Sequence, residues 1–417
     1  LSGAGAATDQ AARAAEHGLA VRAALPFATV VLATGRGVVV PRTSLSLQLG
    51  ASPHNSPPVI GQVIDRAVVR MRAELAAGGT PSEALAVDEV TAGLLDARFE
   101  LGGDAGGLYV TRREESRAPS RTLLGLATPF VGRELEMTQL FAALDACAAE
   151  PAARVVLVTG AAGAGKSRLA GELARLAPER GFEVWIGRGD LVKNHAPFGL
   201  VGRALAALAQ IFDGEPIAVR RRKLRARVGR HLPRERADGV ADFLGEISGT
   251  PFPDLDKREL QSARKNPILL ADLVRRAFEE WLAAECDARP VLLILEDLQW
   301  GDVPSAMLID NALRNLAHQR LAVIGLARPD LDEHHPRLFH QRRVERIALG
   351  ELPAEASRAL ARAVLGPSAS PSLLDALAVR SGGNAFYLEE LLRAVRAGHG
   401  IASLPETVIA MVHARLD

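Results

Sequence analysis

The residues best suited to chemistry lie between Gly160 and Ser167, in a run that reads Gly-Ala-Ala-Gly-Ala-Gly-Lys-Ser. The run follows Val155–Thr159, an apolar and β-branched stretch that predicts a buried strand. Its glycines let the backbone turn tightly and direct N–H groups inward. A helix that begins near Lys166 adds the positive end of its dipole. This arrangement predicts a loop that holds a phosphate group.

The spacing of the run, G-x-x-x-x-G-K-[ST], is that of a P-loop. Lys166 is expected to reach the β- and γ-phosphates of a nucleotide, and the Ser167 hydroxyl to ligand Mg²⁺. The alternative is a glycine-rich turn that binds nothing, but the chain contains only five lysines, so chance rarely produces the pattern. We therefore expect ATP or ADP with Mg²⁺ as the ligand. The residues expected to bind it are Gly160, Gly163, Ala164, Gly165, Lys166, Ser167 and Arg168.

A second run, Val291–Asp297, is an apolar strand that ends in two acids, as in a Walker B element. We expect this strand to lie beside the P-loop strand in a parallel sheet, which brings its carboxyl end to the phosphate loop. The expected Mg²⁺ ligands are then Ser167, Glu296 and Asp297, and one of the two acids can orient the attacking water. The order Glu then Asp leaves open which acid has which role.

Two flanking motifs resemble those of STAND and AAA-type ATPases. Phe130 is followed by Val-Gly-Arg-Glu, similar to a motif whose backbone and apolar residues line the adenine pocket in these families. The resemblance implies nucleotide contacts from Val131, Gly132 and Arg133. The segment 298–302, Leu-Gln-Trp-Gly-Asp, resembles the Leu-His-Trp-Ala-Asp that follows the two acids in large bacterial regulators of this class, with Gln in place of His.

Two later motifs extend the resemblance toward the C-terminus. Leu321–Ala327 predicts a strand, and Arg328 after it matches an arginine that senses the γ-phosphate in STAND proteins, although Leu326 stands where those proteins have Thr. The segment 381–391 is similar to their Gly-Asn-Pro-Phe-Phe-Leu-Glu-Glu-Leu signature, with Ala385 in place of the Pro. The resemblance implies that Arg328 acts in catalysis beside Glu296 and Asp297. It also implies that Asn384 lies near the nucleotide.

The N-terminal segment carries a different resemblance. Its expected order is a helix over 10–24, a hairpin of strands 28–33 and 37–41, a helix to about 76, and a closing hairpin at 99–110. With Ala-Val-Asp-Glu-Val-Thr-Ala-Gly-Leu-Leu at 86–95, this order is similar to the second half of a class III nucleotide cyclase domain. That family uses an Asn and, four residues later, an Arg to stabilise the transition state. Asp65 and Val69 occupy these positions, which implies an inactive unit.

Composition limits the remaining possibilities. Hydrophobic residues make up 48% and charged residues 24% of 417 residues, and no apolar run approaches the about 18 residues of a membrane span. The formal net charge of +1 gives no field that would attract nucleic acid. A basic run over 220–236 repeats apolar residues at helical spacing, so we expect one amphipathic helix with its arginines in solvent. Cys147 and Cys286 are expected to be free thiols, as in a reducing cytoplasm.

These observations predict an α/β protein built from a P-loop NTPase of the AAA+ or STAND type. We expect a parallel five-strand sheet with a helical lid, and a smaller N-terminal cyclase-like α/β unit. The expected domains are a partial, inactive cyclase-like domain over 1–115, a linker over 116–128, an ATPase core over 129–350, and a lid over 351–417 that continues past the last residue. Helices are expected at 354–365, 372–380 and 385–397, and another from Leu404.

The expected function is an ATP-binding, slowly hydrolysing regulatory switch within a multidomain signalling protein. We expect a cytoplasmic protein with nucleotide and protein partners, no membrane association and no nucleic acid bound by this segment. A class III cyclase-related signalling enzyme is one alternative, which the residues at 65 and 69 disfavour. The other is the ATPase part of a transcriptional regulator whose DNA-binding domain lies elsewhere, since no helix-turn-helix is recognisable.

Overall fold

The structure is a computed structural model that describes residues 7–25, 27–35, 38–39, 59–77, 84–95, 99–104, 107–112, 122–123, 126–190, 197–212, 214–336, 338–339 and 342–399. The chain divides into two compact units, each of which combines two stretches of sequence. Unit 1 contains Leu1–Glu115 and Leu205–Trp281, and unit 2 contains Ser116–Ala204 and Leu282–Asp417. Within the described ranges, no helix is both long enough and apolar enough to cross a membrane.

Unit 2 is built on a parallel sheet of five strands in the order β10-β11-β12-β9-β13, which confirms the predicted sheet. The strands are β9 (Arg154–Gly160), β10 (Glu183–Arg188), β11 (Val291–Glu296), β12 (Leu321–Ala327) and β13 (Val344–Leu349). One expectation is wrong: the acidic strand β11 does not lie beside the P-loop strand β9. β12 lies between them and pairs in parallel with both, and it is as fully buried and apolar as β11, so burial alone does not distinguish the two strands.

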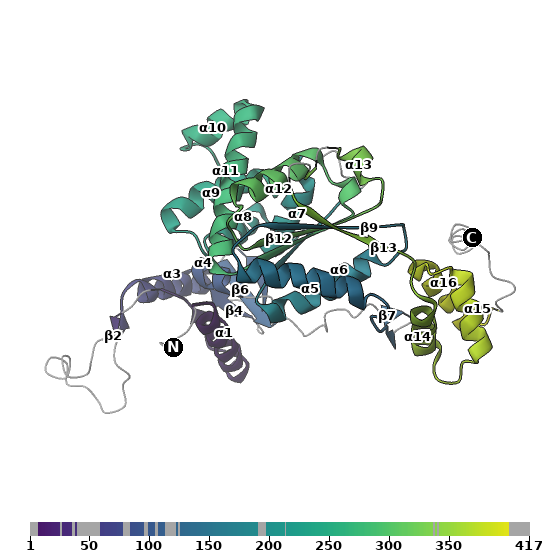
Figure 1. Ribbon diagram of the computed structural model, residues 1–417. Helices are drawn as coiled ribbons and strands as arrows, with labels where there is room; N and C mark the ends of the chain where they lie inside the picture. Colours follow the sequence, from purple (N-terminus) through teal and green to yellow (C-terminus); the bar gives the residue numbers. More distant parts are fainter. Residues whose placement is uncertain are drawn as a thin grey trace. The chain divides into compact units, whose positions relative to one another are not determined.

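Two helices cover one face of this sheet. Figure 1 shows α5 (Glu134–Ala149) and α6 (Lys166–Leu176) on that face and α12 (Val303–Asn315) on the other. The strands are almost continuously apolar, as expected of parallel strands that are covered on both faces. Leu144 and Leu169 are fully buried against β9 and β12 in one core cluster. This core fixes the loops that follow β9, β11 and β12 at one edge of the sheet.

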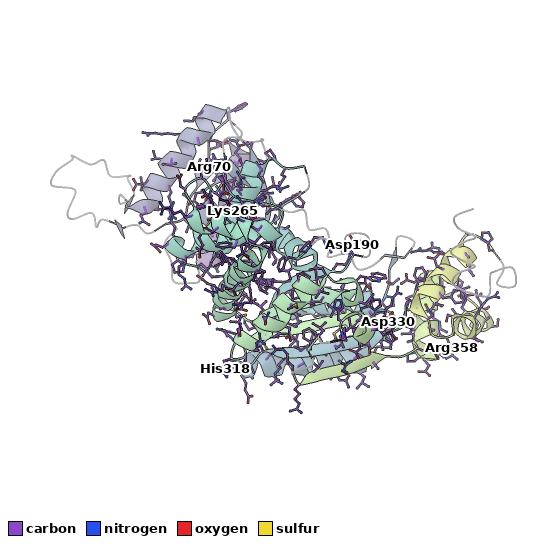
Figure 2. All side chains as sticks on the ribbon, turned by 90° about the horizontal axis from the view of Figure 1, so that it is seen from above. Arg70, Asp190, Lys265, His318, Asp330 and Arg358 are labelled. Atoms are coloured by element: carbon purple, nitrogen blue, oxygen red, sulfur yellow. The ribbon has the colours of Figure 1, made fainter. Side chains whose placement is uncertain are left out.

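The lid consists of α14 (Ala354–Leu365), α15 (Pro371–Ser381) and α16 (Ala385–Arg396), close to the helices predicted from the sequence. Leu377, Leu388 and Leu391 are fully buried in its separate small core. Figure 2 shows His318 before β12 and Asp330 after it at opposite ends of the sheet, with Arg358 of the lid beyond the Asp330 end. The helix expected from Leu404 lies outside the described residues. The lid therefore adjoins the carboxyl ends of the strands.

In unit 1, a sheet in the order β1-β4-β6-β5 is lined by helices from both stretches of sequence. Its strands are β1 (Val31–Leu32), β4 (Leu85–Val87), β5 (Phe99–Asp104) and β6 (Gly107–Arg112), and its N-terminal helices are α1 (Ala7–Ala24), α3 (Gln62–Ala77) and α4 (Glu89–Leu94). The closing hairpin β5-β6 is confirmed. The hairpin expected near residues 28–41 is wrong. β1 pairs in parallel with β4, while β2 (Val38–Val39) pairs with β3 (Val59–Ile60), so each short strand finds a distant partner.

The basic run forms two helices rather than the single one predicted, α8 (Ile217–Val228) and α9 (Arg234–Ile247). The break falls at Gly229–Pro233, where proline cannot donate a helical hydrogen bond. The expectation that the arginines of this run lie in solvent is wrong at Arg227, which is buried. Lys223 of the same run is buried as well. Lys223 donates to Glu215 at 2.6 Å, and the Arg227 guanidinium lies 5.4 Å from the Trp281 ring centroid.

The remaining elements complete the described chain. They are β7 (Thr122–Leu123), β8 (Leu126–Ala127), η1 (Ala177–Arg180), α7 (Gly199–Leu208), α10 (Arg258–Lys265), α11 (Pro267–Ala288), η2 (Leu298–Trp300) and α13 (Leu331–His334). β7 and β8 pair within the stretch expected to be a linker. The predicted domain boundaries themselves stay predictions.

Candidate functional site

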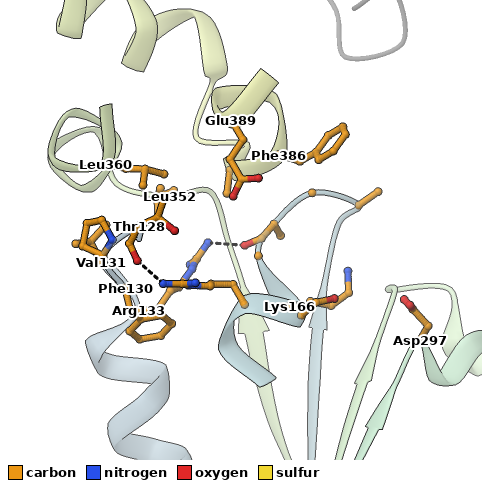
Figure 3. Close-up of a pocket in the computed structure, with 18 of the residues that line it drawn as sticks. Thr128, Phe130, Val131, Arg133, Lys166, Asp297, Leu352, Leu360, Phe386 and Glu389 are labelled. Carbon is orange, nitrogen blue, oxygen red and sulfur yellow. Dashed lines mark hydrogen bonds between the residues drawn. The ribbon is translucent and has the colours of Figure 1, made fainter. Parts of the chain in front are cut away.

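A cavity of about 300 Å³ in unit 2 collects most of the residues singled out from the sequence. Figure 3 shows Lys166 between Asp297 on one side and Arg133, Phe130 and the lid on the other. The wall is formed by Thr128, Pro129, Phe130, Val131, Arg133, Ala162, Gly163, Ala164, Gly165, Lys166, Ser167, Arg168, Asp297, Trp300, Arg328, Leu352, Leu360, Ala385, Phe386 and Glu389. The end around Lys166 and Asp297 is polar, and the other end, between residues 128–131 and the lid, adds apolar side chains beside Arg133 and Glu389.

The loop between β9 and α6 has the backbone of an anion-binding turn. Gly163 and Gly165 have φ angles of 81° and 95°, in the left-handed region that favours glycine. No side chain caps the start of α6, where the N-terminal end of a helix favours an anion. Of its first amides, that of Arg168 already donates to the Gly165 carbonyl at 3.0 Å. A Cβ atom on Gly163 would lie 2.4 Å from Oδ1 of Asn384, so this position also has no space for a side chain.

Lys166 lies folded along the loop. Its Nζ donates to the carbonyl oxygens of Gly160 at 2.7 Å and Ala161 at 2.9 Å. Burial lowers the pKa of the Lys166 ammonium, and the nearby Asp297 carboxylate opposes that effect. A phosphate in the cavity would offer this ammonium charged acceptors in place of neutral carbonyls, which makes a stronger hydrogen bond.

Sheet register brings the strand ends to the loop. Thr159 of β9 pairs with Ala327 of β12, so Gly160 and Arg328 follow at the same level. Asp297, directly after β11, lines the cavity. Glu296 is outside the described lining: it is 6% exposed and forms an ion pair with Arg188 at 3.1 Å. Of the two acids predicted for the site, the structure therefore places one in the cavity wall.

The turn after β11 contains two residues whose roles the sequence did not reveal. Trp300 lies under Arg328, whose guanidinium carbon is 4.7 Å from the ring centroid. The buried amide of Gln299 accepts a hydrogen bond from the backbone N–H of Arg328 at 3.1 Å. Both residues belong to the motif 298–302, and this motif is the sequence feature that could have pointed to them. Their partner, however, lies 29 positions from Gln299.

Asp302 ends the same motif and caps two helices. Its Oδ1 accepts from the backbone N–H groups of Phe198 and Ser305, both at 2.8 Å, and its Oδ2 accepts from Leu200 at 2.9 Å. Ser305 lies in the first turn of α12, and the other two amides lie at the start of α7. A helix N-terminus leaves such amides without partners, so this single buried carboxylate fixes both helix starts beside the site.

The motif 131–133 supports the cavity in two ways. Val131 lines it, whereas Gly132 is outside the described lining and has a φ of 71° where a Cβ atom would lie 2.5 Å from that of Ala356. Arg133 is 6% exposed and donates to the carbonyl oxygens of Ala164 at 3.1 Å and Gly350 at 2.7 Å. Its guanidinium thereby ties the phosphate loop to the chain that follows β13.

The lid makes direct hydrogen bonds to the phosphate loop. Nδ2 of Asn384 donates to the carbonyl oxygen of Ala162 at 3.1 Å, and the backbone N–H of Phe386 donates to the carbonyl oxygen of Gly163 at 3.2 Å. Oδ1 of Asn384 also caps α16 by accepting from the Tyr387 N–H. Asn384 therefore contacts the phosphate loop, but it is outside the described lining of the cavity, and its contact with a nucleotide stays a prediction.

A second cavity, of about 690 Å³, lies in unit 1 and has Asp65 and Val69 in its wall. Its walls also carry arginines, but internal partners engage them: Arg70 forms an ion pair with Glu74 at 2.9 Å, and Arg66 donates to the Thr34 carbonyl at 2.9 Å. This cavity therefore resembles a structural network of ion pairs more than a prepared ligand site.

Comparison with known proteins bears on the first cavity. Residues 129–324 match the AAA ATPase domain family. An uncharacterized protein from Rhizobium meliloti (strain 1021) is 26% identical over 286 residues, which cover 63% of this chain and 25% of that protein. This chain thus spans a quarter of the length of that relative.

Two solved structures show distant similarity. The Aeropyrum pernix ORC1 protein in complex with DNA has a TM-score of 0.40 at 17% identity, over 72% of this chain and 69% of that one. Drosophila ORC bound to DNA has a TM-score of 0.36 at 16% identity, over 72% and 66%. The family match, the phosphate loop and the five-strand parallel sheet support an AAA-type P-loop ATPase core over residues 129–324.

Proposed function

We propose that unit 2 binds ATP with Mg²⁺ and hydrolyses it slowly, as a regulatory switch. The observation that carries this proposal is the cavity itself, in which a phosphate loop, an acid and an arginine meet at one end. The other end offers Phe130, Val131 and Leu352, suited to the flat apolar surface of a purine base. A nucleoside triphosphate likewise has a charged end, the phosphates, and a flat apolar surface at the other end, the base.

The residues at the polar end suit a nucleotide and its metal ion. The open first turn of α6 and Lys166 would hold the phosphates, and the Ser167 hydroxyl with a carboxylate would hold Mg²⁺. When bound, Mg²⁺ neutralises charge on the phosphates. Burial of Glu296 against Arg188 supports Asp297 as the acid that orients water, which leaves Glu296 to act on the metal through water.

Arg328 would distinguish ATP from ADP. It follows β12 at the level of Gly160, and its guanidinium is held by stacking on Trp300. Only ATP carries a γ-phosphate, so an arginine that contacts this group adds affinity for ATP alone. The bias that ATP exerts on the lid can be no larger than this differential affinity.

The lid is the element that a nucleotide would bias. Its residues Leu360 and Phe386 share the cavity wall with the phosphate loop, and Asn384 and Phe386 donate to carbonyl oxygens of that loop. Any shift of the loop on phosphate binding changes these hydrogen bonds. Nucleotide state and lid position are thereby coupled through contacts within one unit.

Two substitutions test the assignment in the full chain. Arg328→Ala should leave ADP affinity nearly intact and reduce ATP affinity about 10-fold or more, the loss of a charge-assisted contact. Asp297→Asn should bind ATP and stop turnover. Calorimetry with both nucleotides and single-turnover hydrolysis measure these effects. Equal losses for ATP and ADP in Arg328→Ala would reduce that residue to a structural role.

The wider setting is also a proposal. The order of motifs from 131 to 391 supports a STAND-type ATPase within a longer cytoplasmic signalling protein that has other domains as partners. The first hairpin of the cyclase order is not formed, but the closing hairpin β5-β6 and helix α3 support a degenerate cyclase-like unit, with Asp65 and Val69 in α3 where a cyclase needs Asn and Arg. We expect no cyclic nucleotide from ATP or GTP with Mn²⁺. Cyclic nucleotide formation that truncation of residues 1–115 abolishes would overturn this assignment.

A further inference from the structure

We propose that Gln299 is a positioning residue for the ATPase reaction, holding the carboxylate of Asp297 and the backbone of Arg328 in one fixed arrangement. The inference rests on the proposed function, because it concerns two residues that line the proposed nucleotide cavity. Gln299 is outside the described lining and 3% exposed, so it would act through its neighbours rather than on the nucleotide.

The two hydrogen bonds of the amide fix its orientation. The backbone N–H of Arg328 donates to Oε1 of Gln299 at 3.1 Å, and Nε2 donates to Oδ1 of Asp297 at 3.4 Å. A backbone N–H can only donate and a carboxylate can only accept, so a flipped amide would lose both bonds. Gln299 is thus a bridge with a defined direction between the ends of β11 and β12.

The bridge is needed because Asp297 is not held by a strand. Its φ angle of 51° lies in the left-handed region, where the chain has already left β11. The Trp300 N–H donates to the Asp297 carbonyl at 2.8 Å, and the Trp300 ring supports the Arg328 guanidinium. These contacts fix the backbone of the turn, while the Gln299 amide contacts the carboxylate itself. Removing the amide should therefore free the carboxylate without unfolding the turn.

A substitution of similar volume tests the bridge. Gln299→Leu removes both hydrogen bonds, and we expect single-turnover ATP hydrolysis to fall about 10- to 100-fold, as for the loss of a bond to a charged group. The preference for ATP over ADP should decrease because the Arg328 backbone is released, whereas the affinity for ADP should stay unchanged. The matched control is Gln319→Leu, which removes an exposed Gln-to-Asp hydrogen bond of 3.0 Å at the start of β12. It should change none of these values.

Two further variants separate positioning from simple packing. Gln299→His can donate to Asp297 and accept from Arg328 through its two ring nitrogens, so it should restore most of the rate. Gln299→Glu keeps the shape of the side chain but places a second carboxylate, which cannot donate, beside that of Asp297, so its rate should stay low.

The outcomes are distinguishable. If the wild-type chain neither binds nor hydrolyses ATP, the proposed function fails and the inference fails with it. If the wild type hydrolyses ATP and Gln299→Leu, folded by circular dichroism, matches it in rate and in nucleotide discrimination, the inference alone is overturned. A rate for Gln299→His no higher than that of Gln299→Leu, or a rate for Gln299→Glu equal to that of the wild type, would also overturn it by indicating a purely steric role.

Discussion

Asp302 offers the sharpest test of how the site is held together. Its carboxylate is 6% exposed and accepts three backbone hydrogen bonds, two at the start of α7 and one at the start of α12. Asp302→Ala leaves these amides without their acceptor. Each lost helix cap costs about 1 to 2 kcal/mol, so two caps together predict a loss of about 2 to 4 kcal/mol in the free energy of unfolding. For a cooperative unit of the size of unit 2, this corresponds to a fall of about 4 to 9 °C in the unfolding midpoint.

Thermal unfolding of the full chain by circular dichroism measures this loss, with urea unfolding as a second probe. Asp302→Asn keeps one acceptor oxygen and should lose about half as much. Asp375→Ala is the matched control, because Asp375 is an exposed acid that pairs with Arg358 at 2.6 Å and should contribute under about 1 kcal/mol. If Asp302→Ala is no less stable than this control, the double cap does not support the site.

Three other predictions follow from burial and backbone geometry. Gly163→Ala should weaken Mg-ATP binding about tenfold in calorimetry, because its left-handed φ disfavours a side chain and the added Cβ meets the lid. The control is Gly171→Ala in α6, where an added Cβ atom would have no neighbouring atom within 4 Å, and it should not weaken binding. Burial raises the pKa of Cys147 to about 11 and also raises that of Cys286, so neither thiol should react with a maleimide at pH 8 before the chain unfolds; rapid labelling would contradict their burial. Burial lowers the pKa of His335 below its ordinary 6.5, so the unfolded state binds more protons and stability should fall as the pH drops through about 6.5. His335→Gln should flatten that fall in urea unfolding across pH 5 to 7.

The phosphate loop could be predicted because its information is local. Eight consecutive residues set the turn, the lysine and the helix start, and the structure keeps them together. The lid helices could be predicted for the same reason, since their apolar spacing is read within each helix. The order of the strands in the sheet could not be predicted, because β11 and β12 are both short, apolar and fully buried, and no local pattern shows which of them pairs with β9. For that reason the sequence did not reveal that β12 separates β9 from β11.

Long-range hydrogen bonds account for the other differences. Arg133 was expected to contact the nucleotide, which stays a prediction, and in the structure its guanidinium binds carbonyl oxygens 31 and 217 positions away. Asp302 caps a helix whose first amides lie more than 100 positions before it. Lys223, in the basic run, is buried and donates to the Gln210 carbonyl at 2.7 Å. In each case a polar side chain satisfies distant backbone groups, and no local pattern encodes that pairing.

The central claim is that the cavity in unit 2 binds Mg-ATP through the phosphate loop. Isothermal titration calorimetry of the full chain with Mg-ATP, beside Lys166→Ala, tests it most directly. We expect saturable binding at one site, and a loss of about 10- to 1,000-fold in affinity when the ammonium that faces the β- and γ-phosphates is removed. Equal ATP affinity in the two chains, or no binding by the wild type, would contradict the claim.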